Sequence, residues 1–174
     1  VHRNGKSYEQ EYSRGKEVYA VRETGTSNRN GTTVTFQPDE EIFETLVYTY
    51  ETLANRMREL AFLNRGLTIT LVDEREMIYD EEGNEEGHLN ETFHSDAGLK
   101  DFVAYLDSNR EALISEVIHV SGERNGVPVE VAMTYNTTFA ENLFSYVNNI
   151  NTYEGGTHLT GFRRGLTLTL KKYA

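Results

Sequence analysis

The sequence predicts an α+β fold, in which helices pack against strands that pair with their neighbours along the chain. Two observations carry this prediction. Apolar side chains recur every three or four residues over 50–64 and again over 159–173, which is the period of a helix. Between these segments, apolar and polar residues alternate on both sides of Asn125-Gly126, a dipeptide typical of hairpin turns.

The N-terminal part contains strand and turn signals. Residues 1–15 have strand character, and Asn4-Gly5 is a hairpin-type turn. Residues 32–36 are rich in β-branched side chains and predict a short strand. Asp39 follows that strand and is placed to cap a short helix with apolar side chains on one face.

Residues 50–64 form the clearest predicted helix. Its apolar side chains make a continuous face, and Gly66 follows as a C-terminal cap. Leu67, Ile69 and Leu71 then alternate with threonines, as they do in a half-buried strand. This order fits a helix laid on a sheet.

A polar stretch with clustered acidic side chains follows, and we expect a surface loop within a hairpin. One interpretation is a solvated surface, and the other is the docking loop of a non-enzymatic interaction module. The clustered residues are Asp80, Glu81, Glu82, Glu85, Glu86 and Glu91.

A domain boundary is predicted after this stretch. A helix over 99–106 is expected to begin after a cap at Ser95 or Asp96, because serine and aspartate accept hydrogen bonds from the first N–H groups of a helix. We therefore divide the chain into residues 1–95 and residues 96–174.

The C-terminal segment is predicted to form a strand over 143–149, a loop and a helix. Gly155 and Gly156 give the loop its backbone freedom, and Thr157 lies where an N-cap is needed. The loop and helix start either hold an anion or only connect two elements. His158 is interpreted as structural, because no serine, cysteine or acidic residue stands beside it.

The charge of the chain is unevenly distributed. Its formal net charge of −11 argues against a protein whose main surface grips DNA phosphates. The C-terminal helix nevertheless gathers basic residues away from its apolar stripe, as candidate phosphate contacts or as solvated charges. These are Arg163, Arg164, Lys171 and Lys172.

The composition excludes several classes of site. There is no cysteine, so disulfides and thiolate metal sites are excluded. The five histidines lack the spacing of metal ligands, and no Walker-type phosphate loop is present. No apolar run reaches the length of a membrane span and no signal peptide is visible, so we expect a soluble, cytoplasmic domain without a complete active site of its own.

Three segments carry a resemblance to a known family. They read NGTTVTFQPDEEIFE from Asn30, YETLANRMRELAFLNRGLTITLVDER from Tyr50, and NNINTYEGGTHLTGFRRGLTLTL from Asn148. Together they resemble, in order, the ATPase subunit of bacterial type IIA topoisomerases. The two kinds of member, from DNA gyrase and from topoisomerase IV, are not separated by these segments.

The resemblance implies two domains. Residues 1–95 would be the C-terminal part of a GHKL-type ATPase domain, and residues 96–174 a transducer domain like domain 2 of ribosomal protein S5, incomplete at its C-terminus. In the family, the general-base glutamate, the magnesium-binding asparagine and the lysine that reaches the γ-phosphate would lie outside this chain. The chain alone is therefore expected to be inactive and to bind ATP and Mg²⁺ only within an intact subunit.

The resemblance also implies roles for individual residues. Thr32 would hydrogen-bond near the adenine of ATP, Val34 would line the adenine pocket, and Arg3 would lie at its rim. The alternative is that Thr32 and Val34 are ordinary strand residues.

The transducer resemblance implies partners. The family acts on DNA together with its A subunit, and two ATPase subunits dimerise when they bind ATP. The four basic residues of the C-terminal helix would face the enclosed DNA. Gly155, Gly156, Thr157 and His158 would form a turn that couples the nucleotide state to the movement of this helix.

Overall fold

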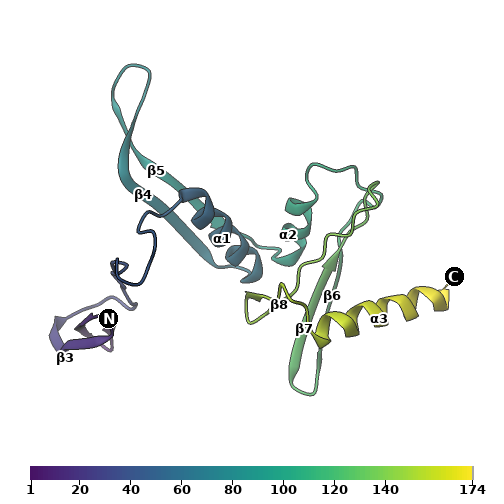
Figure 1. Cartoon of the computed structure of the whole chain (residues 1–174), viewed down its shortest axis with the longest axis horizontal. Coiled ribbons are helices and arrows are strands. Elements are labelled where there is room, and N and C mark those ends of the chain that lie inside the picture. Colours follow the sequence, from purple (N-terminus) through teal and green to yellow (C-terminus); the bar gives the residue numbers. More distant parts are fainter. Residues whose placement is uncertain (174) are drawn as a thin grey trace. The chain divides into compact units, whose positions relative to one another are not determined.

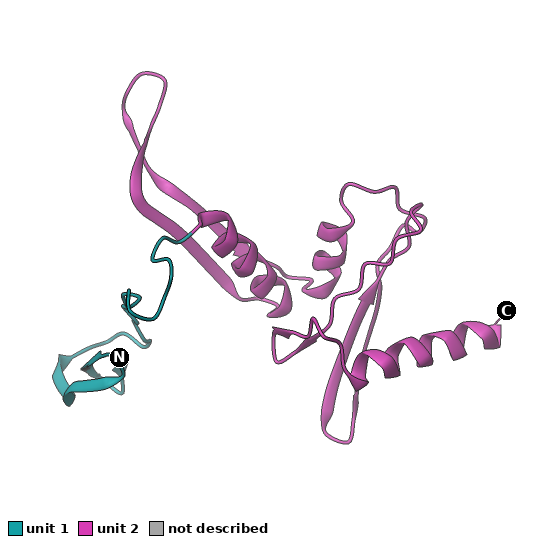
Figure 2. Ribbon diagram, viewed as in Figure 1, with its two compact units in different colours: residues 1–48 teal, residues 49–174 magenta. Residues whose placement is uncertain are grey.

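The computed structural model describes residues 1–173, and the chain divides into two compact units between residues 48 and 49 (Figure 2). Helices and strands are both present, which confirms the mixed α and β content. The predicted division into residues 1–95 and 96–174 separates two family domains rather than two compact units, and it stays a prediction.

Three antiparallel strands form the sheet of the first unit, in the order β1 (His2–Arg3), β2 (Lys6–Ser13) and β3 (Lys16–Thr26). Asn4 and Gly5 form the predicted hairpin turn, with φ angles of 54° and 79°. A second turn at Arg14 and Gly15 leads into β3, a strand that was not predicted.

The strand predicted over residues 32–36 is wrong. The backbone around it makes only an isolated bridge between His2 and Gly31, and no strand lies alongside residues 32–36. A strand needs a neighbour for its N–H and C=O groups, so β-branched composition alone does not produce one. Val34 is accordingly 77% exposed.

The short helix predicted after Asp39 is also wrong, because it stops after one turn. The Asp39 carbonyl accepts the N–H groups of Ile42 and Phe43, and its carboxylate accepts from Glu41 at 3.0 Å, so the cap itself forms. Ile42 is 71% exposed and Phe43 55% exposed. An apolar face without a surface to pack on cannot sustain a short helix.

The second unit begins with helix α1 (Tyr50–Leu63), which lies along the hairpin of β4 (Thr68–Tyr79) and β5 (Glu85–His94) (Figure 1). Ala54, Ala61 and Phe93 are buried where the helix meets the hairpin. The predicted helix, strand and hairpin are confirmed, with Gly66 in a left-handed conformation at φ 82° after the helix. The connecting turn covers only 80–84, so half of the acidic cluster belongs to β5.

Helix α2 (Leu99–Leu106) follows, and Phe102 is its buried residue. The predicted cap at Ser95 or Asp96 is wrong in position, because Gly98 occupies the N-cap. Ser95 lies three residues before the N-cap, where its Oγ accepts the N–H of Gly98 at 2.7 Å and donates to Asp101 at 2.6 Å. The buried hydroxyl thus fixes the chain that enters the helix.

The predicted hairpin at Asn125-Gly126 is confirmed as β6 (Ile118–Arg124) and β7 (Val127–Met133). The strand predicted over 143–149 is wrong. Only β8 (Tyr146–Val147) and β9 (Ile150–Asn151) form, as a very short hairpin. Asn148 and Asn149, with φ angles of 50° and 65°, reverse the chain between them.

Helix α3 (Thr157–Tyr173) ends the described chain. Thr157 is its first helical residue, and the carbonyl of Gly156 accepts the N–H of Thr160 at 3.1 Å. Gly156 therefore takes the N-cap position that was predicted for Thr157.

Among residues 1–173, no helix combines the length and the apolar character that crossing a membrane requires.

Candidate functional site

The residues predicted to line an adenine pocket lie in the first unit. Thr32 and Val34 are exposed in the extended segment that follows β3, and Arg3 is exposed on β1. An adenine ring requires a closed, mostly apolar slot. These three exposed side chains do not enclose such a slot among themselves, so the described residues alone do not fit ATP.

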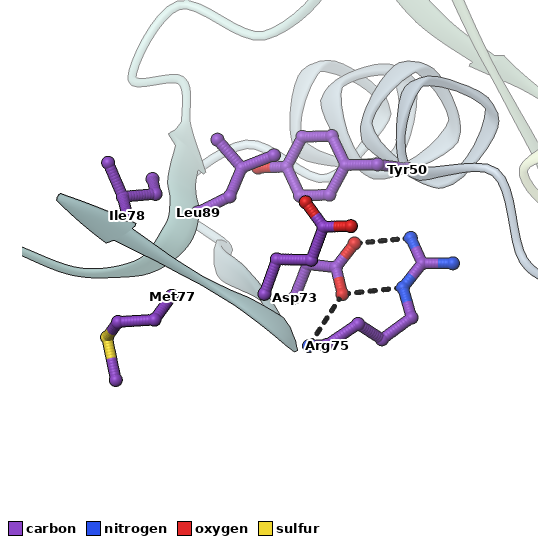
Figure 3. Close-up of a pocket in the computed structure, with 7 residues that line it drawn as sticks. Tyr50, Asp73, Arg75, Met77, Ile78 and Leu89 are labelled. Carbon is purple, nitrogen blue, oxygen red and sulfur yellow. Dashed lines mark hydrogen bonds and ion pairs between the residues drawn. The ribbon is translucent and has the colours of Figure 1, made fainter.

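A cavity of about 490 Å³ lies between the start of α1 and strands β4 and β5. Figure 3 shows the residues that line it. Its polar side contains Asp73, whose Oδ1 accepts from Arg75 Nε at 2.7 Å and from the Arg75 backbone N–H at 3.1 Å. The negative charge of Asp73 and the positive charge of Arg75 therefore balance each other on this side of the cavity. The remaining lining residues are Tyr50, Glu76, Met77, Ile78 and Leu89.

The hydrogen bonds from Arg75 lower the pKa of Asp73 to about 2. Because the pKa in the folded state lies below the ordinary value of 3.8, the carboxylate stabilises the fold above about pH 4, and this contribution disappears as the pH falls towards 2. Replacing Asp73 by asparagine should therefore reduce the urea midpoint at pH 6 and reduce it by a clearly smaller amount at pH 2.5, where part of the stabilisation has been lost. Glu74→Gln, an exposed neighbour, is the control, and an equal loss for Asp73→Asn at both pH values would contradict the prediction.

The predicted coupling turn is built around its two glycines. Gly155 has a φ of 79°, and its N–H donates to the carbonyl of Thr152 at 2.8 Å. A Cβ atom on Gly156 would lie 2.7 Å from Cε1 of His158, closer than real Cβ contacts. The backbone angle favours glycine at Gly155, and at Gly156 any larger side chain would force the His158 ring to move.

Thr152 connects this turn to the start of the β8–β9 hairpin. Its Oγ1 donates to the carbonyl of Ser145 at 3.0 Å and lies 2.6 Å from the Ser145 hydroxyl. Nε2 of His158 lies 3.1 Å from the same Oγ1. His158 thus contacts the threonine that holds the two ends of the hairpin together. No motif in the sequence indicated this contact.

The four basic candidates on α3 differ in their surroundings. Arg163 forms an exposed ion pair with Glu141 at 3.1 Å. Arg164 is exposed, and Lys171 and Lys172 lie in the last turn of the helix. The apolar stripe of α3 is half-buried near the N-terminus of the helix and exposed towards its end.

A junction that no signal in the sequence indicated lies between α1 and the β8–β9 hairpin. The Tyr146 hydroxyl donates to Oε2 of Glu59 at 2.9 Å. Nη2 of Arg56 donates to the carbonyl of Asn149 at 2.9 Å, and Arg56 also forms an ion pair with Glu59. Nδ2 of Asn149 donates to Oδ1 of Asn64 at 2.8 Å. Three residues, from the middle of α1 to its C-cap, therefore hold one hairpin.

An aromatic cluster packs beneath this junction. The ring of Phe102 on α2 stacks on Phe62 of α1 at 5.2 Å between centroids. It also contacts Phe144 at 6.2 Å and Tyr146 at 6.3 Å. Burial raises the pKa of Tyr146 above its ordinary value, so its hydroxyl stays protonated as a donor.

Metal ligation has no candidate in the part of the chain that the structure describes, because no three His, Asp or Glu side chains converge there.

Comparison with known proteins gives a match to one family and to several curated proteins. Residues 98–174 match the family described as DNA gyrase B. The DNA gyrase B subunit from Cytophaga aurantiaca is 55% identical to the whole chain, which covers 35% of that protein. The DNA gyrase B subunit from Chitinophaga japonensis is 52% identical over 99% of the chain, which covers 36% of that protein. The chain thus spans about a third of these curated relatives.

Solved structures agree with this comparison. The 43K ATPase domain of Thermus thermophilus gyrase B, crystallised with an aminocoumarin, matches the whole chain with a TM-score of 0.79 and 31% identity, over 45% of that structure. The B-subunit of the DNA gyrase from Myxococcus xanthus matches 98% of the chain with a TM-score of 0.75, over 47% of that structure. At 21% identity, this second likeness supports the fold alone.

Proposed function

We propose that the chain is part of a DNA gyrase B subunit and couples ATP use to DNA movement within that intact subunit. The match of residues 98–174 to the family described as DNA gyrase B, and the 55% identity of the whole chain to about a third of a DNA gyrase B subunit, support this proposal. The intact subunit would be part of an ATP-dependent type II topoisomerase. The residues of this chain would transmit the nucleotide state rather than perform the chemistry.

One observation carries this proposal. Asn149, in the family segment that begins at Asn148, is hydrogen-bonded to Arg56 and Asn64 of the family segment that contains α1, across 93 and 85 positions of the sequence. Tyr146, just before the later segment, donates to Glu59 of α1. Those bonds connect residues 1–95, the proposed ATPase part, with residues 96–174, the proposed transducer part. A change of position in one part is therefore passed to the other through direct contacts.

The remaining assignments follow from the family. We propose a GHKL-type ATPase domain and an S5-like transducer domain, with ATP and Mg²⁺ bound in the intact subunit, where Thr32, Val34 and Arg3 would contribute one side of the adenine pocket. DNA, the A subunit of DNA gyrase and a second copy of the ATPase subunit would be the partners. The cytoplasm would be the compartment.

The decisive experiment combines the intact subunit with the A subunit of DNA gyrase and relaxed plasmid DNA. ATP-dependent negative supercoiling is the expected result. Decatenation without supercoiling would instead identify topoisomerase IV, and ATP hydrolysis that DNA does not stimulate would contradict the coupling function.

The basic residues of α3 provide a prediction about DNA. Replacing Arg164, Lys171 and Lys172 together by alanine should weaken DNA stimulation of the ATPase and reduce its salt dependence, because each lost phosphate contact lowers the slope of log affinity against log salt by about 0.9. DNA titrations at several salt concentrations measure that slope. The control is Lys100→Ala on α2, and an unchanged slope in the triple variant would assign the α3 charges to solvation.

A further inference from the structure

We propose that Arg56 and Glu59 are positioning residues, which clamp the β8–β9 hairpin to α1 and thereby fix where α3 begins. The inference rests on the proposed coupling function and deepens it, because it names the side chains through which a movement of α1 would reach α3.

The clamp is a closed ring of contacts. From the hairpin, Tyr146 donates to one carboxylate oxygen of Glu59. Arg56 pairs with the other oxygen and returns to the hairpin through the carbonyl of Asn149. Because the hairpin is attached both at β8 and in its turn, it cannot rotate about a single bond. The contact between Asn149 and Asn64 adds a third point, just over one helical turn beyond Glu59.

The spacing on α1 makes this ring possible. Arg56 and Glu59 are three residues apart, so both side chains project from the same side of the helix. Glu59 is 20% exposed and Tyr146 is half-buried, so water competes weakly for their hydrogen bond. A partner left without its bond at such a site keeps its desolvation penalty, which makes the contact costly to break.

The hairpin is also the structural route from α1 to α3. Among residues 1–173, α3 has no close backbone contact with another helix or strand. The N–H and the hydroxyl of Thr152 both bond to Ser145, which ties the residue after β9 to the residue before β8. Only the turn that contains Gly155 and Gly156 then separates the clamped hairpin from the first residue of α3. A displacement of α1 must therefore displace the origin of α3.

Tyr146→Phe tests the clamp in the intact subunit, combined with the A subunit of DNA gyrase. It removes only the hydroxyl that binds Glu59 and keeps the ring against Phe102. We expect DNA-stimulated ATP hydrolysis and supercoiling per ATP to fall by about fivefold or more, at the low end of typical coupling effects. ATP hydrolysis without DNA should change by less than about twofold. The matched control is Tyr153→Phe, whose side chain is 88% exposed.

A double-variant cycle asks whether the effect passes through Glu59. Glu59→Gln removes the ion pair with Arg56, and adding Tyr146→Phe to it should cause little further loss, because both changes open the same ring. Independent, multiplying losses would overturn the clamp. Equal losses of ATP hydrolysis with and without DNA would also overturn it, since they would indicate a merely structural role.

Failure of the clamp and failure of the proposed function have different signatures. Normal coupling in Tyr146→Phe together with lost coupling in Gly156→Val would reject the clamp and keep the coupling function. Normal coupling in both variants would reject the clamp and the role of the turn, whereas ATP hydrolysis that DNA does not stimulate in the unaltered subunit would reject the coupling function itself.

Discussion

Replacing Gly156 by valine in the intact subunit is expected to reduce DNA-stimulated ATP hydrolysis and supercoiling by about tenfold or more, within the range of known coupling free energies. A Cβ at this position would lie 2.7 Å from Cε1 and 2.8 Å from Nδ1 of His158. The ring must therefore move, and its 3.1 Å contact with Thr152 Oγ1 is lost. Supercoiling assays beside ATPase assays with and without DNA measure the effect.

A glycine within α3 supplies the control. A Cβ added to Gly161 would meet nothing within 4 Å, so Gly161→Ala should leave coupling intact. Adding His158→Ala to Gly156→Val removes the clash, and the double variant should then behave like His158→Ala alone. A double variant as impaired as Gly156→Val would show that the ring is not the cause.

The parts of the fold that could be predicted are those determined by neighbouring residues. Asn4-Gly5 and Asn125-Gly126 form hairpin turns because their own φ angles are positive, whatever lies further away. The helix over 50–64 was equally secure, since its apolar period matched a face that packs on β4 and β5. Local geometry was sufficient in each case.

The errors occurred where a structure depends on a partner. Residues 32–36 have strand composition but no neighbouring strand, and 143–149 are interrupted by two asparagines that reverse the chain. The strand β3 was missed, although Arg14-Gly15 connects it to β2 with a tight turn. Arginine before glycine is not among the usual signals of such a turn.

The candidate site shows the same limit more strongly. The glycines of the coupling turn were visible in the sequence, and the family resemblance gave them a role. Nothing in the sequence places Tyr146 against Glu59, because 87 residues separate them and neither belongs to a motif for this contact. Tertiary packing brings them together, and the ring of Phe102 on α2 contacts both Phe62 of α1 and Tyr146 of β8.

The second large expected effect concerns the ring of Phe102. Phe102→Ala should lower the free energy of unfolding by about 3–5 kcal/mol, the usual loss when a buried phenylalanine is truncated. Phe102 is 7% exposed and contacts aromatic rings from α1, from the segment before β8 and from β8 itself. Alanine would leave a cavity where these three segments meet, and the hydrogen bonds of the junction would lose their support.

Urea denaturation of the intact subunit, followed by circular dichroism, measures the loss. Phe139→Ala is the matched control, because this phenylalanine is fully exposed and its removal should change stability by less than about 0.5 kcal/mol. If Phe102→Ala were equally mild, the aromatic cluster would not be what holds α1, α2 and the hairpin together. The hydrogen-bonded clamp would then have to maintain the junction alone. In that case Tyr146→Phe should lower the free energy of unfolding as well as reduce DNA-stimulated ATP hydrolysis.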